Sequence, residues 1–323
     1  MGTKRRTLLK GVGVLLLLGI AVFAARSYPW LAMPDASVAQ IDQHWGALAK
    51  VARPAPFVAK SAASLSKAID LLRTSRYPYK AVKATERIEL DALDAKAAAA
   101  LEALRGWAAN GGLGKEILQC RAGLHVPSIL ALAKVGFAVA QTVEDGNVRA
   151  VLRLSHVLRK SRRLPYAMTG FFLARVFVRW AQSRGVKVSR AALRHHPEPA
   201  DVYRAVVGDY RCSYRALQAR FSGQRFAYSC KTRSPFAPPD VGALPCEFVS
   251  TQRELVMYRW YVGRMLSRAS AHGGDLASLE RALTPPPMDE RPQSLVVRRY
   301  LLDPSFLGKV RGHLEAYRAA IGR

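Results

Sequence analysis

The feature that most constrains this chain is a run of fifteen residues near its start, 11–25, in which no side chain is polar. A core helix would keep one polar face, whereas this run is apolar all round and suits hydrocarbon. Residues 7–25 give nineteen residues with Lys10 as the only charge, close to the roughly 20 apolar residues that a membrane-spanning helix needs. We therefore expect residues 1–30 to form a basic tip followed by a transmembrane anchor.

The charges and aromatic residues beside this run predict its orientation. Four cations precede the run, and only Arg26 follows closely, before Tyr28 and Trp30. Cations favour the cytoplasmic side of a membrane helix, and Tyr and Trp favour the membrane–water boundary. We expect a single-pass inner-membrane protein with a cytoplasmic N-terminus and an extracytoplasmic, periplasmic bulk. The alternative is a cleaved signal peptide, which shares the basic start and the short apolar run.

The rest of the chain is also strongly basic. The sequence has 50 Lys and Arg against 23 Asp and Glu, and residues 1–26 hold five of these cations and none of the acids. Such an excess favours anionic partners, such as lipid headgroups, nucleic acid or acidic polysaccharide. Apolar residues make up 50% of the chain, which is too many for a disordered basic tail, so we expect a packed core.

The spacing of apolar residues predicts an all-α fold. Helices are expected over residues 36–51, 115–122, 147–160, 166–184, 201–221, 251–271, 276–283 and 304–321. Three more helices are expected: one with Ser61 or Ser64 as its cap, one that begins at Asp91 or Asp94, and one that begins at Pro127. We expect Asp145, Gly146 and Asn147 to form a tight turn. No set of alternating strands is visible, so the expected architecture is an irregular array of antiparallel helical hairpins over residues 31–290, with a C-terminal helical segment, 291–323, packed on it.

The cysteine pattern permits disulfides in an exported protein. Four cysteines occur, at positions 120, 212, 230 and 246, with no Cys-x-x-Cys among them. We expect a Cys230–Cys246 disulfide, because these two residues bracket a Pro-rich loop whose ends must meet if the helices on either side are neighbours. A Cys212–Cys230 bond is the alternative, and Cys120 is expected to be a buried thiol.

One part of the chain resembles a known group of proteins. The order "LDAKAAAALEALRGWAANGG", "CRAGLHVP" and "LALAKVGFAVAQTVEDGNVRAVLRLSHVLRK" is similar to uncharacterised, membrane-anchored, all-helical bacterial proteins of the planctomycete type. The resemblance covers about residues 60–185. It implies an all-α fold and export, and it implies no activity.

Catalytic motifs are sparse, so an enzyme is the minority hypothesis. Ser64 and Lys67 match the Ser-x-x-Lys pattern, in which the lysine takes the proton of a nucleophilic serine. The companion motifs of those enzymes are missing, and a capped amphipathic helix is the favoured explanation of the pair. His195 and His196 are adjacent, so they point about 100° apart on a helix and suit one metal ion poorly. No cofactor, metal ligand set or catalytic residue is therefore expected.

The clustering of cations is the strongest functional signal. From Gly146 to Pro197, fifty-two residues contain twelve Lys and Arg and no acid, and the next helix carries three more Arg on one face. Tyr203, Tyr210 and Tyr214 share the spacing of those arginines, and we interpret them as core-edge residues rather than stacking platforms. The expected anion-binding residues are Arg149, Arg153, Lys160, Arg162, Arg163, Arg204, Arg211 and Arg215.

These observations predict a membrane-anchored extracytoplasmic interaction or scaffold protein with a cationic surface. Its expected partner is an anionic membrane surface or envelope polymer, with other envelope proteins as further partners and no specific nucleic acid. Two alternatives stay open. One is a cell-envelope hydrolase or transferase that uses Ser64 and Lys67, and the other is a binder of nucleic acid or another polyanion without sequence preference.

Overall fold

The fold is described from a computed structural model of the 323-residue chain. The structure describes residues 13–22, 36–76, 93–117, 119–120, 124–139, 145–183, 196–221, 251–271, 275–284, 294, 297 and 301–320. Every regular element within these ranges is a helix, and none is a strand. The expected all-α class is therefore confirmed.

The chain divides into two compact units. The smaller unit comprises Met1–Trp45, Ala216–Arg264 and Pro285–Leu301, and the larger comprises Gly46–Arg215, Met265–Thr284 and Leu302–Arg323. Three helices, α2 (Val38–Val51), α9 (Pro199–Phe221) and α11 (Thr251–Ala271), contribute residues to both. The division by sequence into residues 1–30, 31–290 and 291–323 stays a prediction.

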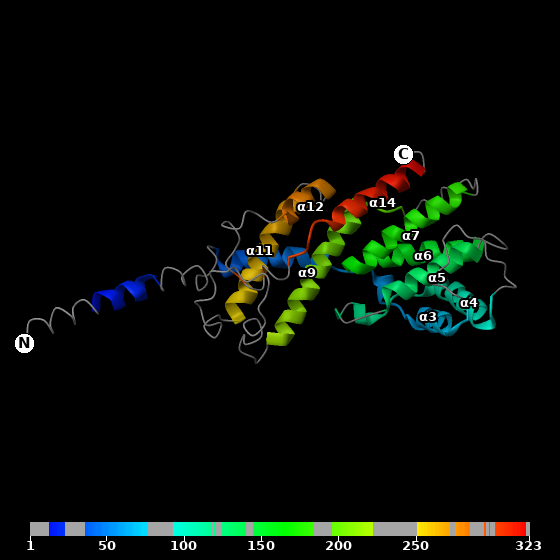
Figure 1. Ribbon diagram of the computed structural model, residues 1–323, viewed down its shortest axis with the longest axis horizontal. Coiled ribbons are helices and arrows are strands. Elements are labelled where there is room, and N and C mark those ends of the chain that lie inside the picture. The colour runs from blue at the N-terminus through cyan, green and yellow to red at the C-terminus, as the bar shows by residue number, and fades with distance from the viewer. Residues whose placement is uncertain are drawn as a thin grey trace, which may run out of the picture. The chain divides into compact units, whose positions relative to one another are not determined.

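Helices α3 (Ala63–Thr74) and α4 (Ala95–Asn110) pack against each other in the larger unit (Figure 1). The predicted apolar face of α3 is buried. The residue that caps α4 is Asp94, whose carboxylate accepts a hydrogen bond from Ala97 N–H at 2.8 Å. Gly111 ends α4, and Trp107 Nε1 donates to Gly112 O at 2.9 Å. The expected helix and both of its end signals are confirmed.

Helices α5 (Val126–Val139), α6 (Asp145–Arg159) and α7 (Leu164–Ser183) complete the centre of the larger unit (Figure 1). Ten residues of α5 are buried, as its nearly uniform apolar sequence predicts. Where α6 and α7 cross, Gly170 lies so close to α6 that an added Cβ would be 2.7 Å from Ser155 O. The predicted hairpin of residues 147–160 and 166–184 is thus present.

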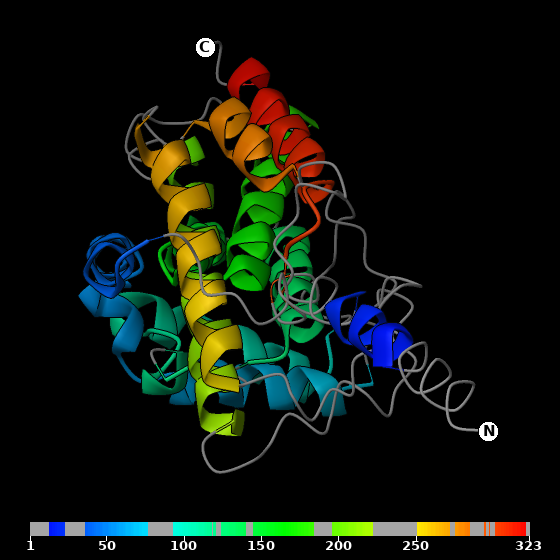
Figure 2. The ribbon, with the colours of Figure 1, turned by 90° about the vertical axis from the view of Figure 1, so that its left-hand side faces the viewer.

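The remaining helices of the larger unit include α12 (Leu276–Leu283), which Asp275 caps, and α14 (Phe306–Ala320). Figures 1 and 2 show α14 running beside α7. On α9, Tyr203 and Tyr210 are buried, and Tyr203 Oη donates to Leu266 O at 3.1 Å. Tyr210 Oη accepts from Leu302 N–H at 2.9 Å. These two tyrosines are core residues, as interpreted from the sequence.

The described part of the smaller unit is held by aromatic and charged contacts. The Trp45 ring meets the Tyr258 ring edge-on, with centroids 6.3 Å apart, and Arg259 pairs with Asp42. Glu254 is fully buried. Its Oε1 accepts a hydrogen bond from Arg253 Nη1 at 2.7 Å, and its Oε2 accepts one from Ser294 Oγ at 2.8 Å. Helix α2 begins with a capping box: Ser37 Oγ accepts from Gln40 N–H at 3.2 Å, and Ser37 N–H donates to Gln40 Oε1 at 3.2 Å. Asp35 lies outside the described residues.

Residues 13–22 form a helix whose side chains are all exposed. They include seven large apolar residues: Val14, Leu15, Leu16, Leu17, Leu18, Ile20 and Val22. Among the described residues, no helix combines the length and the apolar character that crossing a bilayer requires. The remainder of the expected anchor, residues 7–12 and 23–25, lies outside the described ranges.

Two local predictions are wrong. Asp145, Gly146 and Asn147 form the first turn of α6 and not a tight turn, and buried Asn147 accepts a hydrogen bond from Arg105 of α4 at 2.8 Å. The contact with α4 gives the asparagine amide a partner inside a helix, where local turn propensity alone would not place it. The expected helix at 115–122 is a 3₁₀ turn over Lys115–Ile117, followed by a turn at residues 119–120.

Candidate functional site

A disulfide joins Cys120 to Cys212 in the larger unit. It links the turn after Ile117 to α9, across 92 residues of sequence, with the two Cα atoms 5.1 Å apart. The expectation that Cys120 is a thiol is wrong, and so is the alternative pairing of Cys212 with Cys230. Local spacing could not reveal this pairing, because tertiary packing brings the two residues together. Cys230 and Cys246 lie outside the described residues, so their bond stays a prediction.

The connection between α6 and α7 brings several predicted cations around one buried carboxylate. Asp201, in the first turn of α9, has no exposed side-chain surface, and its oxygens lie 2.7 Å from Lys160 Nζ and 3.1 Å from Arg159 Nη1. Arg162 and Arg204 approach the same carboxylate at 3.6 and 3.9 Å. Since Arg159 is only 2% exposed, Asp201 is the counter-ion that makes its burial tolerable.

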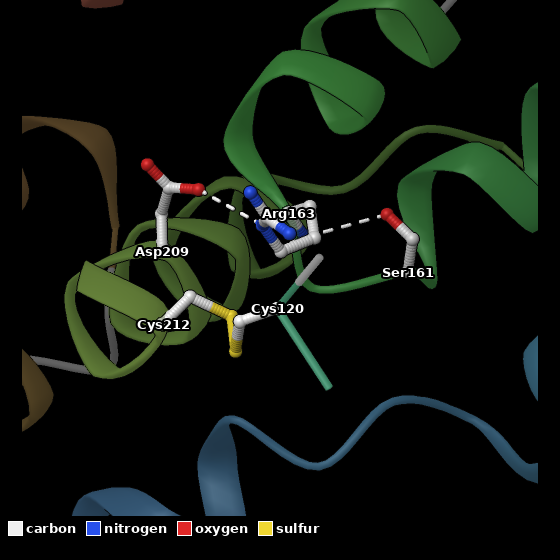
Figure 3. The surroundings of a disulfide bond; sticks show 5 residues. All are labelled: Cys120, Ser161, Arg163, Asp209 and Cys212. Carbon is white, nitrogen blue, oxygen red and sulfur yellow. Dashed lines mark hydrogen bonds and ion pairs between the residues drawn. A yellow bond between two sulfur atoms is a disulfide. The ribbon is translucent and has the colours of Figure 1, made fainter. Parts of the chain in front are cut away.

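A second ion pair and a close backbone contact fix the end of this connection on α9. Arg163 Nε donates to Asp209 at 3.2 Å, and Figure 3 shows the Arg163 side chain beside the disulfide. The carbonyl of Arg162 lies against Gly208, where an added Cβ would be only 2.0 Å from the oxygen. Arg162 itself has a left-handed backbone with φ of 60°, a conformation that is strained for a residue with a side chain.

These contacts form the walls of a cleft in the larger unit, which we call the arginine cleft. Its volume is about 310 Å³. Five arginines line it, and no acidic side chain is among the described residues of its lining. The arginines are Arg53, Arg162, Arg163, Arg211 and Arg215, and the Cys120–Cys212 disulfide and Gly208 form part of the wall.

The electrostatics of the cleft show that positive charge is crowded there. Burial lowers the pKa of the Arg162 guanidinium below its ordinary value, nearby Arg204 lowers it further, and Asp201 opposes both. Burial likewise lowers the pKa of Arg211, and the neighbouring charge of Arg215 adds to the effect. Arginine keeps its proton under all ordinary conditions, so these guanidinium groups stay charged and repel one another. An anion that binds between them would relieve this repulsion.

The structure places the eight predicted anion-binding residues in three different settings. Four of them, Arg162, Arg163, Arg211 and Arg215, line the arginine cleft. Lys160 and Arg204 contact Asp201 and do not line it. The other two lie elsewhere on α6, where Arg149 is exposed and the Arg153 guanidinium packs over the Phe57 ring at 4.8 Å from its centroid.

Sequence reasoning missed three residues that define the site. The sequence marks Asp201 only as a helix start, although an acid that follows an acid-free basic region so closely is a candidate counter-ion for it. Arg53 was passed over because it follows α2 in a Pro-rich break, far along the chain from the other cations. Arg159 lies within the basic run, and only its 2% exposure distinguishes it as a buried ion-pair partner.

Neither enzymatic candidate lines the two cavities described for this chain. Ser64 and Lys67 are both exposed on α3, and neither lines the arginine cleft. A second cavity, of about 580 Å³, is lined by Ser61, Ser66, Lys115 and Glu116 without either residue of the Ser-x-x-Lys pair. Within the described ranges, no group of three His, Cys, Asp or Glu side chains is placed to hold a metal ion. His195 lies outside these ranges.

Comparison with known proteins adds no further constraint. No family profile, curated protein or solved structure matches this chain. The resemblance of residues 60–185 to planctomycete-type helical proteins therefore stays a prediction, and any functional conclusion has to come from the arginine cleft and its surroundings.

Proposed function

We propose that this protein is a membrane-tethered, extracytoplasmic helical protein that binds anionic surfaces or polymers of the cell envelope. The single observation that carries the proposal is the arginine cleft, in which five arginines line one cavity. Eight cations line the cleft or contact the carboxylates behind it: Arg53, Arg159, Lys160, Arg162, Arg163, Arg204, Arg211 and Arg215. Two carboxylates, Asp201 and Asp209, take part in these contacts. Cations therefore outnumber acids in this group, which favours an anionic partner.

The exposed apolar helix supports the tether. Seven large apolar side chains of residues 13–22 are exposed, and in water such a surface would favour aggregation or burial. Burial of these side chains in a bilayer would remove their surface from water at roughly 25 cal/mol per Å². The cations before residue 11, and Tyr28 and Trp30 after the run, support a cytoplasmic N-terminus and an extracytoplasmic bulk in the inner membrane.

A vesicle-capture experiment tests the binding function. The full chain is placed in neutral phosphatidylcholine nanodiscs and offered fluorescent vesicles, either of phosphatidylcholine alone or with phosphatidylglycerol. We expect capture of the anionic vesicles only, and we expect it to weaken as salt rises, because about 0.1 M salt screens charges beyond roughly 10 Å.

Two outcomes would contradict the binding proposal. Equal capture of neutral vesicles, or capture that does not change with salt, would show that the charge excess is only a solvated surface. Competition by a random-sequence oligonucleotide that is much stronger than competition by anionic vesicles would instead favour the nucleic-acid alternative.

Alkaline carbonate extraction of membranes tests the tether separately. We expect the full-length chain to stay in the membrane pellet, since an inserted apolar helix resists a wash that removes peripheral proteins. Release of the full-length chain into the wash would refute an anchor. A mature N-terminus near Ala25 would show the signal-peptide alternative.

A further inference from the structure

The arginine cleft has the dimensions of a small-ligand site and not those of an extended polymer track. Its volume of about 310 Å³ lies at the lower end of the roughly 300–1,000 Å³ found for small-molecule sites. A membrane surface or a polymer strand needs no enclosed space. The cleft is therefore suited to one compact group that enters between its walls.

Separate segments of the chain supply the arginines of the cleft. Arg53 follows α2, Arg162 and Arg163 belong to the α6–α7 connection, and Arg211 and Arg215 lie one turn apart on α9. The Cys120–Cys212 disulfide ties the turn after Ile117 to α9 within the same wall. The disulfide and the ion pairs of Arg162 and Arg163 hold the walls of the cleft in place before a ligand arrives, which reduces the ordering cost of binding.

Positive charge dominates the described lining of the cleft. Arg163 pairs with Asp209, and Arg162 approaches Asp201, whereas no acid lines the cleft within the described residues. The Nη1 atoms of Arg162 and Arg163 are buried and make no hydrogen bond, and Arg162 Nη1 lies 3.6 Å from Asp201 Oδ1. An oxyanion with several acceptor oxygens would provide partners for donors on more than one wall after a small side-chain adjustment.

The number of arginines favours a multivalent oxyanion over a carboxylate. A carboxylate carries one charge and is matched by a single guanidinium fork. A phosphomonoester carries a charge of about −1.5 to −2 at neutral pH and three strong acceptor oxygens. Five arginines around one cavity are therefore better matched by a terminal phosphate or a pyrophosphate than by an acidic side chain or a uronic acid.

We propose that the arginine cleft is a discrete site for one terminal phosphate or pyrophosphate group, carried by a lipid headgroup or by a soluble phosphoester. This inference rests on the proposed function and narrows it from anionic partners in general to a phosphorylated group. The same chemistry occurs in both sources, so the experiment separates them.

The test uses the full chain in a neutral detergent and isothermal titration with inorganic pyrophosphate. We expect saturable binding at one site per chain. The variant Arg53→Gln/Arg211→Gln should weaken pyrophosphate binding by about tenfold or more, because it removes two charge-assisted contacts. Neither side chain is an ion-pair partner of Asp201 or Asp209, so the ion pairs of these two carboxylates are kept.

A matched control removes the same charge elsewhere. Arg73 and Arg179 are exposed on α3 and α7, and Arg73→Gln/Arg179→Gln should change pyrophosphate affinity by less than about twofold. The exposed Arg215→Gln variant provides a second, single substitution in the cleft. Equal losses in the cleft variant and the control would show diffuse attraction and overturn the discrete site, as would binding that does not saturate.

Mixed micelles distinguish the source of the phosphate. Phosphatidic acid carries a terminal phosphomonoester, and phosphatidylglycerol carries only a diester. If the natural group is a lipid headgroup, phosphatidic acid micelles should displace pyrophosphate and phosphatidylglycerol micelles should not. If neither displaces it while soluble phosphomonoesters do, the source is a soluble phosphoester.

The two proposals fail in different ways. Capture of phosphatidylglycerol vesicles without saturable pyrophosphate binding would keep the proposed function and overturn the discrete site. Pyrophosphate binding without capture of anionic vesicles would overturn the surface-binding function and keep the site.

Discussion

At the scale of single residues, the carboxylate of Asp201 contacts several of the cations that the sequence predicts to bind anions. It lies within ion-pair distance of Arg159, Lys160 and Arg162. Part of the acid-free basic sequence therefore serves an internal purpose, because its cations hold the α6–α7 connection on the first turn of α9. We therefore expect a substitution of Asp201 to lower the stability of the fold more than it changes anion binding.

We expect Asp201→Ala to lower the free energy of unfolding by about 3–5 kcal/mol, because it leaves the buried Arg159 guanidinium without its counter-ion. Chemical denaturation followed by circular dichroism measures the loss. The control is Asp209→Ala, whose ion pair with Arg163 is 19% exposed on each side and should contribute about 1 kcal/mol or less. Equal losses for the two variants would contradict a special role for Asp201.

A double substitution separates the ion pair from simple packing. Arg159→Met/Asp201→Leu replaces both charges with apolar side chains, and such replacements of buried ion pairs are often neutral or stabilising. We expect this variant to recover most of the stability that Asp201→Ala loses, by the same denaturation measurement. No recovery would show that Lys160 and Arg162 depend on the carboxylate as strongly as Arg159 does.

At the scale of helices, the α6–α7 crossing depends on a glycine. A Cβ at Gly170 would lie 2.7 Å from both Ser155 O and Arg159 Cγ, whereas a Cβ at Gly106 in α4 would meet nothing within 4 Å. Both residues are inside helices, so their intrinsic preferences are the same. The difference between them is the space that the neighbouring helix leaves.

We expect Gly170→Ala to destabilise the protein by about 1–3 kcal/mol through overpacking. Gly106→Ala should stabilise it by about 0.5–1 kcal/mol, since alanine is the better helix former where space is free. Thermal denaturation of the two variants in parallel provides the measurement. Stabilisation by both substitutions would mean that α6 and α7 move apart without cost.

The α7–α14 contact contains a histidine that resists protonation. Arg175 Nη1 lies 3.3 Å from His313 Nδ1, and a guanidinium only donates, so this nitrogen is the unprotonated one. Burial lowers the pKa of His313 below its ordinary value of 6.5, and the charges of Arg175 and Arg179 lower it further. Below pH 6.5 the unfolded chain therefore binds more protons at this site than the folded chain does.

From this direction of the pKa shift, His313 should make the folded state less stable as the pH falls below about 6.5, with the loss complete below the lowered pKa. Urea denaturation at pH 8 and pH 5 should show a smaller difference for His313→Gln than for the unmodified chain. The control His125→Gln should keep the full difference. An unchanged pH dependence in His313→Gln would contradict the assignment.

Most helices could be predicted from sequence because their signals are local. The buried face of α3 follows from apolar spacing, and the Asp94 cap of α4 from its side chain and position. The prediction was wrong at Asn147, where local turn preference is outweighed by a hydrogen bond from Arg105, 42 residues earlier. Tertiary contacts of this kind leave no mark in a window of neighbouring residues.

At the scale of the whole molecule, the arginine cleft could be predicted only in part. Charge clustering indicated four of its five arginines, because they fall in or just after one basic region. It could not indicate Arg53, nor the split between the cleft and the Asp201 contacts, because these depend on how α2, α9 and the α6–α7 connection pack. The disulfide was missed for the same reason, since 92 residues separate its cysteines.

The observed disulfide narrows the possible pairings. Because Cys120 and Cys212 are already paired, Cys230 and Cys246 can pair within the chain only with each other. Tryptic digestion without reduction should link the peptide of residues 226–231 to that of residues 234–253, and the peptide of residues 116–121 to that of residues 212–215. Mass spectrometry before and after reduction identifies both linked pairs. Free thiols at positions 230 and 246 in the protein purified from its native membranes would rule out the second bond.

The Cys120–Cys212 pairing has a consequence for biosynthesis. These residues are the first two of the four cysteines in order of synthesis. A chain that emerges N-terminus first offers Cys212 to Cys120 before either later cysteine is present. Successive oxidation of cysteines as they appear would give the native bond directly. Maturation should therefore require an enzyme that introduces disulfides, and it should proceed normally in cells that lack the enzyme that rearranges them.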